Sequence, residues 1–174
     1  MQDVIAQDGS AVLIPLVSID DETGAVAFNM DPRPEVMRQR ITAYKDYLLS
    51  LPDAVQEDFP VEHSVHDGVY TRKLFIRKGA ILVGKIHKKA CQNIVAKGDI
   101  TVVTETGMAR VQAGYTVVSP AGIQKVGFAH EDTIFINVFR TDKTDIDEIE
   151  AEIACESFDD VPQIANESAV KLCQ

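Results

Sequence analysis

Lys85, His87 and Lys125, in the middle of the chain, have side chains suited to binding a small charged molecule. The imidazole of His87 either ligates a metal or donates a hydrogen bond near neutral pH. The ammonium groups of Lys85 and Lys125, with an ordinary pKa of about 10.4, stay protonated there and lack the lone pair that a metal needs. Buried ammonium groups also need a negative partner. If the fold brings both lysines together with His87 in its interior, they therefore favour an anion, such as phosphate, a carboxylate or a nucleotide.

Cys91 and His66 offer a second kind of chemistry, because thiolate and imidazole together form tetrahedral metal sites. With His87 they make a donor set for zinc, iron or manganese. Their spacing does not by itself define a metal site, so the anion is our first interpretation. Cys91 also follows Lys88 and Lys89, whose positive charge is expected to lower the pKa of its thiol.

The composition limits the class of protein. Among 174 residues, 27 are acidic and 17 basic, and the resulting formal charge of −10 predicts repulsion from duplex nucleic acid and from anionic membranes. The three cysteines show no paired spacing, and no signal peptide is evident at the start. No apolar run approaches the roughly 20 residues of a membrane span. We therefore expect one compact cytoplasmic domain.

Residues 1–60 are expected to supply short strands and one helix that packs on the rest of the protein. The apolar runs 11–17 and 25–28 predict one or two strands. Asp31 and Pro32 then fit the N-cap and the first position of a helix. The apolar residues that follow recur at spacings of four and three, which is typical of an amphipathic helix: Met37, Ile41, Tyr44, Leu48 and Leu51.

Residues 61–141 change to a β pattern. Short segments rich in β-branched and aromatic residues, separated by glycine and polar turns, predict an antiparallel sandwich or barrel. The segments are 68–77, 81–88, 92–96, 100–106, 109–112, 115–119, 125–128 and 133–140. Eight strands suffice for a jelly roll of two sheets. Alternate side chains of a strand share a face, so Lys85 is expected to align with His87, and Arg72 with Tyr70.

Residues 142–174 predict a C-terminal helix followed by a tail. Ile146, Ile149 and Ile153 have helical spacing, and Thr144 begins a run that resembles a capping box. Periodicity weakens after residue 156, which is typical of a partly ordered end.

Two stretches resemble the sequence motifs of the cupin superfamily. The first motif has a glycine, His-x-His, a glutamate four or five residues later and a closing glycine; here those places hold Gly79, Lys85, His87, Cys91 or Gln92, and Gly98. The second has a glycine, five residues and Pro-x-Gly-x-x-His; here they hold Gly114, Pro120, Gly122 and Lys125. The turn residues are kept, while one of the three metal ligands of the first motif remains and Lys125 stands at the histidine place of the second.

This resemblance implies an RmlC-like fold: mainly β, a double-stranded β-helix or jelly-roll barrel, with a degenerate metal site inside. It implies that Lys85 and His87 line the barrel interior and that Lys125 reaches the same cavity from a facing strand. Tyr70 and Arg72 are expected to face inward as well. Since cupins commonly dimerise, it also implies a homodimer or higher homo-oligomer. Lysines that extend to solvent from a filled barrel are the alternative arrangement.

Residues 66–140 also resemble small cupin-like proteins encoded by tailed bacteriophages. The similar runs begin at His66, Val83, Lys97, Ser119 and His130. Members of that family tend to have further histidines where Lys89 and Cys91 stand here. The resemblance implies a viral context, in the host cytoplasm or the virion, and no particular reaction.

Three functions are compatible with these residues. The first, which we favour, is a binding protein for a small anion, such as a host nucleotide signal, that uses no catalytic residue and no cofactor. Its binding residues are Lys85, His87, Lys125, Arg72 and Tyr70. The second is a virion or assembly protein without a ligand. The third is a mononuclear metal-dependent cupin enzyme whose metal is held by His66, His87 and Cys91.

Overall fold

The computed structural model describes residues 15–52 and 59–161, and the chain divides into two compact units. The first unit holds residues 1–56 and the turn 105–107; the second holds the rest. In the first unit, β1 (Val17–Ile19) and β2 (Val26–Phe28) form an antiparallel hairpin, and α1 (Pro34–Ser50) follows. The carboxylate of Asp20 fixes the hairpin turn by accepting a hydrogen bond from the backbone N–H of Thr23 at 2.7 Å.

Helix α1 begins at Pro34, so the predicted N-cap at Asp31 is wrong. Asp31 instead accepts hydrogen bonds from the backbone and the guanidinium of Arg33, each at 2.9 Å. The Asp31 carboxylate therefore binds Arg33 in a turn that precedes the helix. Pro34 then provides the fixed φ that suits a first helical residue. The predicted apolar stripe is confirmed, since its members are all buried or half-buried: Met37, Ile41, Tyr44, Leu48 and Leu51.

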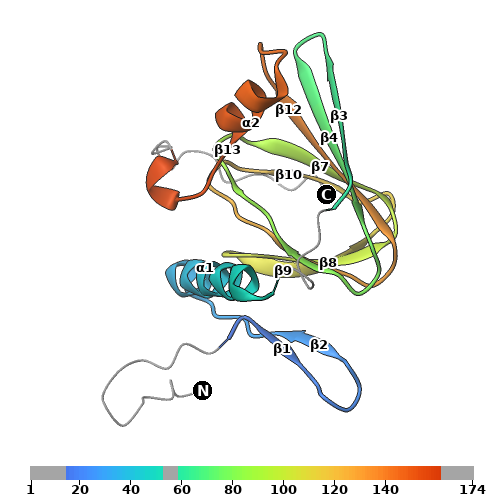
Figure 1. Cartoon of the computed structure of the whole chain (residues 1–174), viewed down its shortest axis with the longest axis vertical. Coiled ribbons are helices and arrows are strands. Elements are labelled where there is room, and N and C mark those ends of the chain that lie inside the picture. Colours follow the sequence, from blue (N-terminus) through green and yellow to red (C-terminus); the bar gives the residue numbers. More distant parts are fainter. Residues whose placement is uncertain (1–14, 53–58, 162–174) are drawn as a thin grey trace. The chain divides into compact units, whose positions relative to one another are not determined.

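The second unit is a sandwich of two antiparallel sheets (Figure 1). The larger sheet has the order β10-β7-β12-β4-β3, with β3 (Val61–His66), β4 (Val69–Ile76), β7 (Cys91–Lys97), β10 (Thr116–Ser119) and β12 (Thr133–Arg140). The smaller sheet has the order β5-β11-β8-β9, with β5 (Ile81–Val83), β8 (Asp99–Thr104), β9 (Gly107–Gln112) and β11 (Val126–Ala129). Apart from the β8–β9 hairpin, consecutive strands from β4 onward change sheet, in jelly-roll order. The mainly-β jelly-roll prediction is confirmed.

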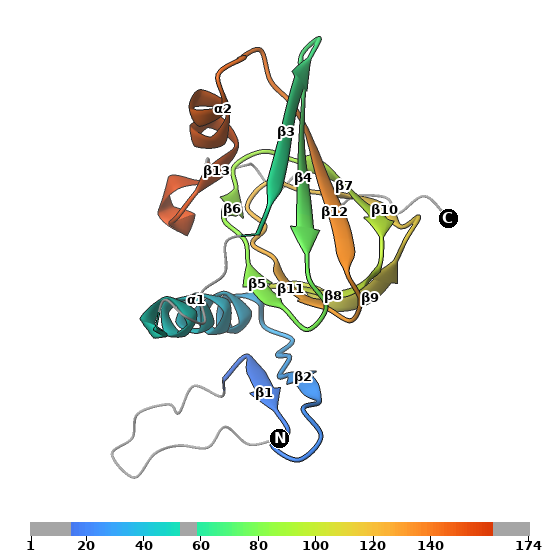
Figure 2. The ribbon, with the colours of Figure 1, turned by 45° about the vertical axis from the view of Figure 1, so that its right-hand side comes forward.

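The C-terminal helix α2 (Ile146–Ile153) lies beside the sandwich, as the two views of Figures 1 and 2 show. Its N-cap is Asp145, whose carboxylate accepts a hydrogen bond from the N–H of Glu148 at 3.0 Å. After it, β13 (Ala154–Cys155) pairs with β6 (Ile86–His87), and a short 3-10 helix, η2 (Phe158–Asp160), follows. The predicted C-terminal helix is therefore confirmed, and most of the predicted tail lies outside the described residues.

The predicted strand 81–88 is interrupted at Gly84 and Lys85, which separate β5 from β6. The N–H of Gly84 donates to the carbonyl of Lys125 at 2.8 Å, and its carbonyl accepts from the side chain of Gln124 at 2.9 Å. These bonds replace regular strand pairing, so the side chains from Ile81 to His87 do not alternate regularly between the two faces of one strand. Leu82 packs on the apolar core, although its position in the strand has the opposite parity to Lys85 and His87, the residues expected to point inward.

Two apolar clusters are found among the described residues of the sandwich. The first cluster draws on both sheets and is made of Leu74, Ile76, Val95, Ile100, Val111 and Ala129. The second joins the larger sheet to α2 and is made of Tyr70, Cys91, Phe139, Ile149 and Ile153. On β4, Arg72 lies between Tyr70 of one cluster and Leu74 of the other. Because the three are alternate residues of the strand, their side chains point to the same face. Polar residues therefore reach the interior between the two clusters.

Neither helix in the part of the chain that the structure describes has the length and apolarity required to cross a membrane. The expectation that residues 1–60 pack on the barrel stays a prediction.

Candidate functional site in the barrel interior

A row of polar residues crosses the inner face of the larger sheet. The register places Arg72 of β4 opposite Asn137 of β12, and Asn137 opposite Asn93 of β7. Residues directly opposed on antiparallel strands point to the same face. Asn93 and Asn137 are only 2% and 5% exposed. Polar groups buried this deeply need hydrogen-bond partners from the protein or from a ligand.

Asn93 organises this row through its amide. Its Nδ2 donates to Ser119 Oγ at 2.8 Å and to the carbonyl of Val117 at 3.1 Å. Its Oδ1 accepts from Asn137 Nδ2 at 2.8 Å and lies 3.5 Å from the Cys91 thiol. The amide is thereby held in one orientation, and the row is a fixed polar surface inside the barrel.

His87, at the end of β6, contacts two of the predicted site residues. Its Nδ1 lies 3.3 Å from Lys125 Nζ and 3.3 Å from Cys91 Sγ, and its ring packs edge-on against Phe139. Burial, reinforced by the positive charges of Lys125 and Arg72, lowers the pKa of His87 to about 3, so the ring is neutral. An ammonium group only donates, so Nδ1 accepts and we assign the proton to Nε2.

Lys85 lies at the rim of the interior, with 52% of its side chain exposed. Its Nζ lies 3.7 Å from Glu150 Oε2 and 3.9 Å from Glu156 Oε1. Glu150 Oε1 also lies 3.5 Å from Arg72 Nε. A carboxylate of α2 thus faces two of the predicted anion-binding cations, an arrangement that sequence reasoning did not anticipate.

Arg72 Nε is a buried donor. It makes no hydrogen bond with any residue of the described ranges, although Glu150 lies nearby. A buried N–H without an acceptor is unfavourable. This donor therefore favours an added acceptor close to the polar row.

Tyr70 is fully buried in the second apolar cluster. Its hydroxyl lies 2.7 Å from Nδ1 of His63 on the neighbouring strand β3. Burial, together with the negative charge of Glu150, raises the pKa of Tyr70 to about 12. His63, which was not among the predicted binding residues, therefore sets the position of the Tyr70 hydroxyl.

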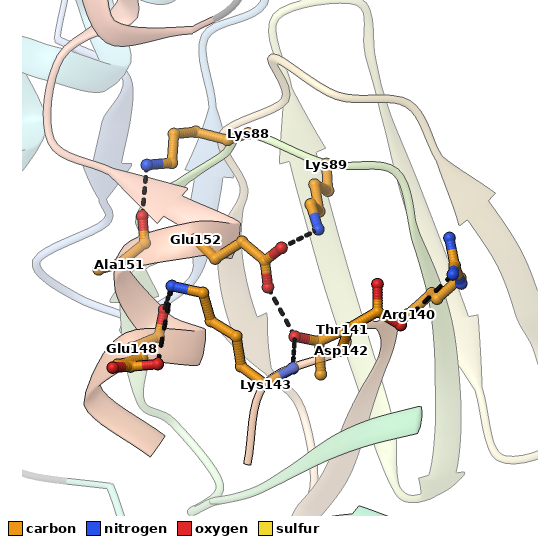
Figure 3. Close-up of polar contacts among 9 residues, drawn as sticks. All are labelled: Lys88, Lys89, Arg140, Thr141, Asp142, Lys143, Glu148, Ala151 and Glu152. Carbon is orange, nitrogen blue, oxygen red and sulfur yellow. Dashed lines mark hydrogen bonds and ion pairs between the residues drawn. The ribbon is translucent and has the colours of Figure 1, made fainter. Parts of the chain in front are cut away.

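Lys88 and Lys89, adjacent to the site in sequence, hold α2 in place (Figure 3). Lys88 Nζ donates to the carbonyl of Ala151, and Lys89 Nζ contacts Glu152 Oε1 at 2.5 Å. Thr141 donates to the other oxygen of Glu152 at 2.6 Å. These contacts fix the helix that carries Glu150.

The predicted lowering of the Cys91 thiol pKa is wrong. Lys88 and Lys89 are engaged with α2 (Figure 3), and Cys91 is buried. Burial raises the pKa of Cys91, although Lys125 acts in the opposite direction. The thiol is therefore protonated at neutral pH and is no activated nucleophile.

The structure does not bring His66 to His87 and Cys91. His66 ends β3 opposite Val69, is 85% exposed, and pairs with Asp67 at 3.2 Å. Because His66 stands three residues from His63 on β3, the two side chains point to opposite faces of the strand. In residues 15–52 and 59–161 no group of three or more His, Cys, Asp or Glu side chains is arranged to hold a metal ion. His87 and Cys91, with an ammonium group against Nδ1, do not fit zinc, iron or manganese.

No protein-family model matches the chain, and no curated protein matches it. Solved structures to which it is similar include KdgF from a Halomonas species, at 18% identity and TM-score 0.44 over 52% of this chain and 91% of that one. A cupin-2 domain protein from Shewanella frigidimarina is 12% identical, with a TM-score of 0.41 over 60% of this chain and 99% of that one. An RmlC-like cupin from Methanocaldococcus jannaschii is 16% identical, with a TM-score of 0.41 over 49% of this chain and 83% of that one. That protein is described with a double-stranded β-helix fold. The jelly-roll assignment rests on the strand order of this chain itself.

Proposed function

We propose that this chain is a binding protein for a small anionic ligand, held in the jelly-roll interior by Lys125, His87 and Arg72. Lys85 and Tyr70 complete the site at its rim and wall. The observation that carries the proposal is the buried Nε of Arg72, which has no hydrogen-bond acceptor among the described residues. The Nζ of Lys125 lies 3.3 Å from His87 Nδ1, and the charges of Lys125 and Arg72 add to the burial that lowers the pKa of His87. Two positive charges in this region attract an anion.

The donors available to such a ligand are of three kinds. Lys125 offers a compact ammonium group, and Arg72 offers a buried Nε proton that has no hydrogen-bond acceptor in the described part of the chain. His87, protonated on Nε2, offers one neutral N–H. Glu150 faces Arg72 and Lys85 and competes with the ligand. A bound anion therefore displaces or shares this carboxylate.

The ligand class extends from phosphate and simple carboxylates to a nucleotide. The resemblance to small phage cupins supports the narrower version, a viral protein in the host cytoplasm that sequesters a host nucleotide signal. We propose no catalytic residue, because the Cys91 thiol is protonated and His66 lies apart from His87.

Isothermal titration calorimetry tests the proposal with phosphate, acetate, AMP, a cyclic mononucleotide and a cyclic dinucleotide. We expect saturable heat for at least one anion, and at least tenfold weaker binding in Lys125→Met, because a charge-assisted hydrogen bond contributes about 1.5–3 kcal/mol. Lys97→Met removes the same charge from an exposed position at the end of β7 and is the matched control. Absence of heat with every anion, or equal affinity in both variants, would refute the proposal.

A second candidate is an assembly role, favoured by exposed apolar side chains at the sheet edge. Val118 on the edge strand β10 is 45% exposed, and Tyr115, just before that strand, is also exposed. An apolar edge strand is a surface for pairing with another chain. If the chain assembles through β10, sedimentation shows a dimer or larger species that Val118→Lys converts to a monomer. A fixed number of copies in purified virions would support a role as a virion component.

A further inference from the structure

A groove of about 530 Å³ lies in the first unit, between the β1 segment and one face of α1. Arg40, Ala43, Tyr44 and Tyr47 contribute from the helix, and Leu16 and Ile19 are among the residues that contribute from the strand side. The helix residues recur at spacings of three and four, so they share a face. A mostly apolar concavity of this size with few polar groups is typical of small-molecule sites.

Among the described residues that line the groove, Arg40 is the charged one, and its Nε has no hydrogen-bond partner. It is 6% exposed, and only its Nη1 makes a hydrogen bond within the described residues, to the carbonyl of Asn29 at 2.9 Å. Its Nε is buried without an acceptor there. Its Nη2 lies 3.7 Å from Asp31 Oδ2, beyond hydrogen-bonding distance.

Asp31 does not complete Arg40, because its carboxylate is already engaged. Arg33 donates to Asp31 from its backbone N–H, from Nε and from Nη2, at 2.9, 2.9 and 2.8 Å. These bonds lower the pKa of Asp31 and commit its charge chiefly to Arg33. A buried guanidinium with one hydrogen bond to the described residues favours a further acceptor, because an unsatisfied buried charge is costly.

The rest of the groove suits an apolar body. Ile19 and Tyr47 are 57% and 56% exposed, which is high for such large apolar side chains. Covering them removes apolar surface from water, which is favourable at about 25 cal/mol per Å². One cation matches one acid group, and guanidinium binds a carboxylate through two parallel hydrogen bonds.

From this charge complementarity we propose that the groove binds an amphipathic monocarboxylate, whose acid group is held by Arg40 and whose hydrocarbon body lies along Leu16, Ile19 and Tyr47. All the lining residues belong to the first unit. The site is thus distinct from the anion site proposed in the barrel.

Calorimetric titration of the full chain with decanoate, below its micelle concentration, tests this site, with decyltrimethylammonium as the probe of opposite charge. We expect one decanoate per chain and at least tenfold weaker binding of the cation. Ala43→Trp fills the groove from an exposed helix position and is expected to weaken decanoate binding at least tenfold. Gln39→Trp, also exposed on α1 but outside the groove lining, should leave the affinity unchanged.

Arg40→Gln should abolish the preference for decanoate over the cation, and Arg40→Lys should retain most of it. Circular dichroism checks that the Arg40 variants fold; if they do not, the Ala43→Trp and Gln39→Trp pair decides. Lack of decanoate binding by the wild type, or undiminished binding by Ala43→Trp, overturns the proposal. Loss of decanoate binding in Lys125→Met would also overturn it, by assigning the ligand to the barrel.

Discussion

Glu150 Oε1 lies 3.5 Å from Arg72 Nε, so the C-terminal helix places a carboxylate against a cation of the larger sheet. The same residue approaches Lys85 with its other oxygen. This negative charge occupies the region where we propose an anionic ligand to bind. Glu150 therefore affects both the stability of the barrel and its affinity for anions.

Glu150→Gln is expected to lower the free energy of unfolding by about 1–2 kcal/mol, since it removes the carboxylate that faces Arg72 and one of the two that face Lys85 in a partly buried setting. The same change should raise the affinity for an anion several-fold, because the internal competitor is gone. Urea denaturation and calorimetry measure the two effects. Glu148→Gln, which changes an exposed ion pair with Lys143 at 3.9 Å, is the control and should cost less than about 0.5 kcal/mol. Unchanged stability in Glu150→Gln would contradict the assigned role.

The buried neutral ring of His87 predicts a loss of stability on acidification. Its pKa is about 3 in the folded chain and about 6.5 when unfolded, so the unfolded state binds more protons between these values. The free energy of unfolding should therefore fall as the pH decreases below about 6.5, by up to about 1.4 kcal/mol per pH unit from this residue. Urea melts at pH 7.0, 6.0 and 5.0 measure the slope.

His130 contributes in the same direction, because burial lowers its pKa as well. The comparison is therefore with His87→Gln, which keeps His130 and should show a smaller slope than the wild type. Equal slopes in the two proteins would mean that folding does not lower the pKa of His87.

The sequence predicted the jelly roll because its strands carry local signals. Glycine turns and β-branched runs marked the eight segments that became β4, β5 with β6, and β7 to β12. Strand β3 was not predicted, since its run from Val61 to His66 holds two histidines, a serine and a glutamate. Its pairing with β4 is what positions His63 against Tyr70.

The site was predicted less completely than the fold. The motif resemblance identified His87 and Lys125, and the structure places these side chains in contact. Glu150 gave no signal, because it lies between isoleucines of an amphipathic helix and its partners depend on how that helix docks. The interruption at Gly84 likewise depends on a tertiary contact, the hydrogen bond to Lys125, and it moved Lys85 from the expected wall to the rim.

Gly98 and Gly114, two glycines of the cupin-like motifs, form a matched pair for a stability test. Both have positive φ, of 90° and 93°. Alanine at Gly114 meets no atom within 4 Å, so only backbone strain of about 1–2 kcal/mol is expected. At Gly98 a Cβ would lie 2.6 Å from the carbonyl oxygen of Asp132, and backbone has to move. Thermal or urea unfolding should show that Gly98→Ala costs at least about 2 kcal/mol more than Gly114→Ala; similar costs would exclude close packing at Gly98.

Asn93→Ala tests the polar row directly. It leaves Asn137 Nδ2 without its acceptor and Ser119 without its donor in the buried interior, so the free energy of unfolding should fall by at least about 2 kcal/mol. Gln92→Ala is the matched control, because the Gln92 side chain is exposed and, among the described residues, bonds only to Thr116. Its effect should be within about 0.5 kcal/mol.

The double variant Asn93→Leu with Asn137→Leu separates hydrogen bonding from packing in the same row. Replacing both partners removes the buried donor of Asn137 together with its acceptor, so the double variant should be less destabilised than the sum of the two single leucine variants, with a coupling above about 1 kcal/mol. Urea denaturation of the four proteins measures this coupling. Additive costs would show that the two amides contribute independently, and the polar row would then not be a connected surface.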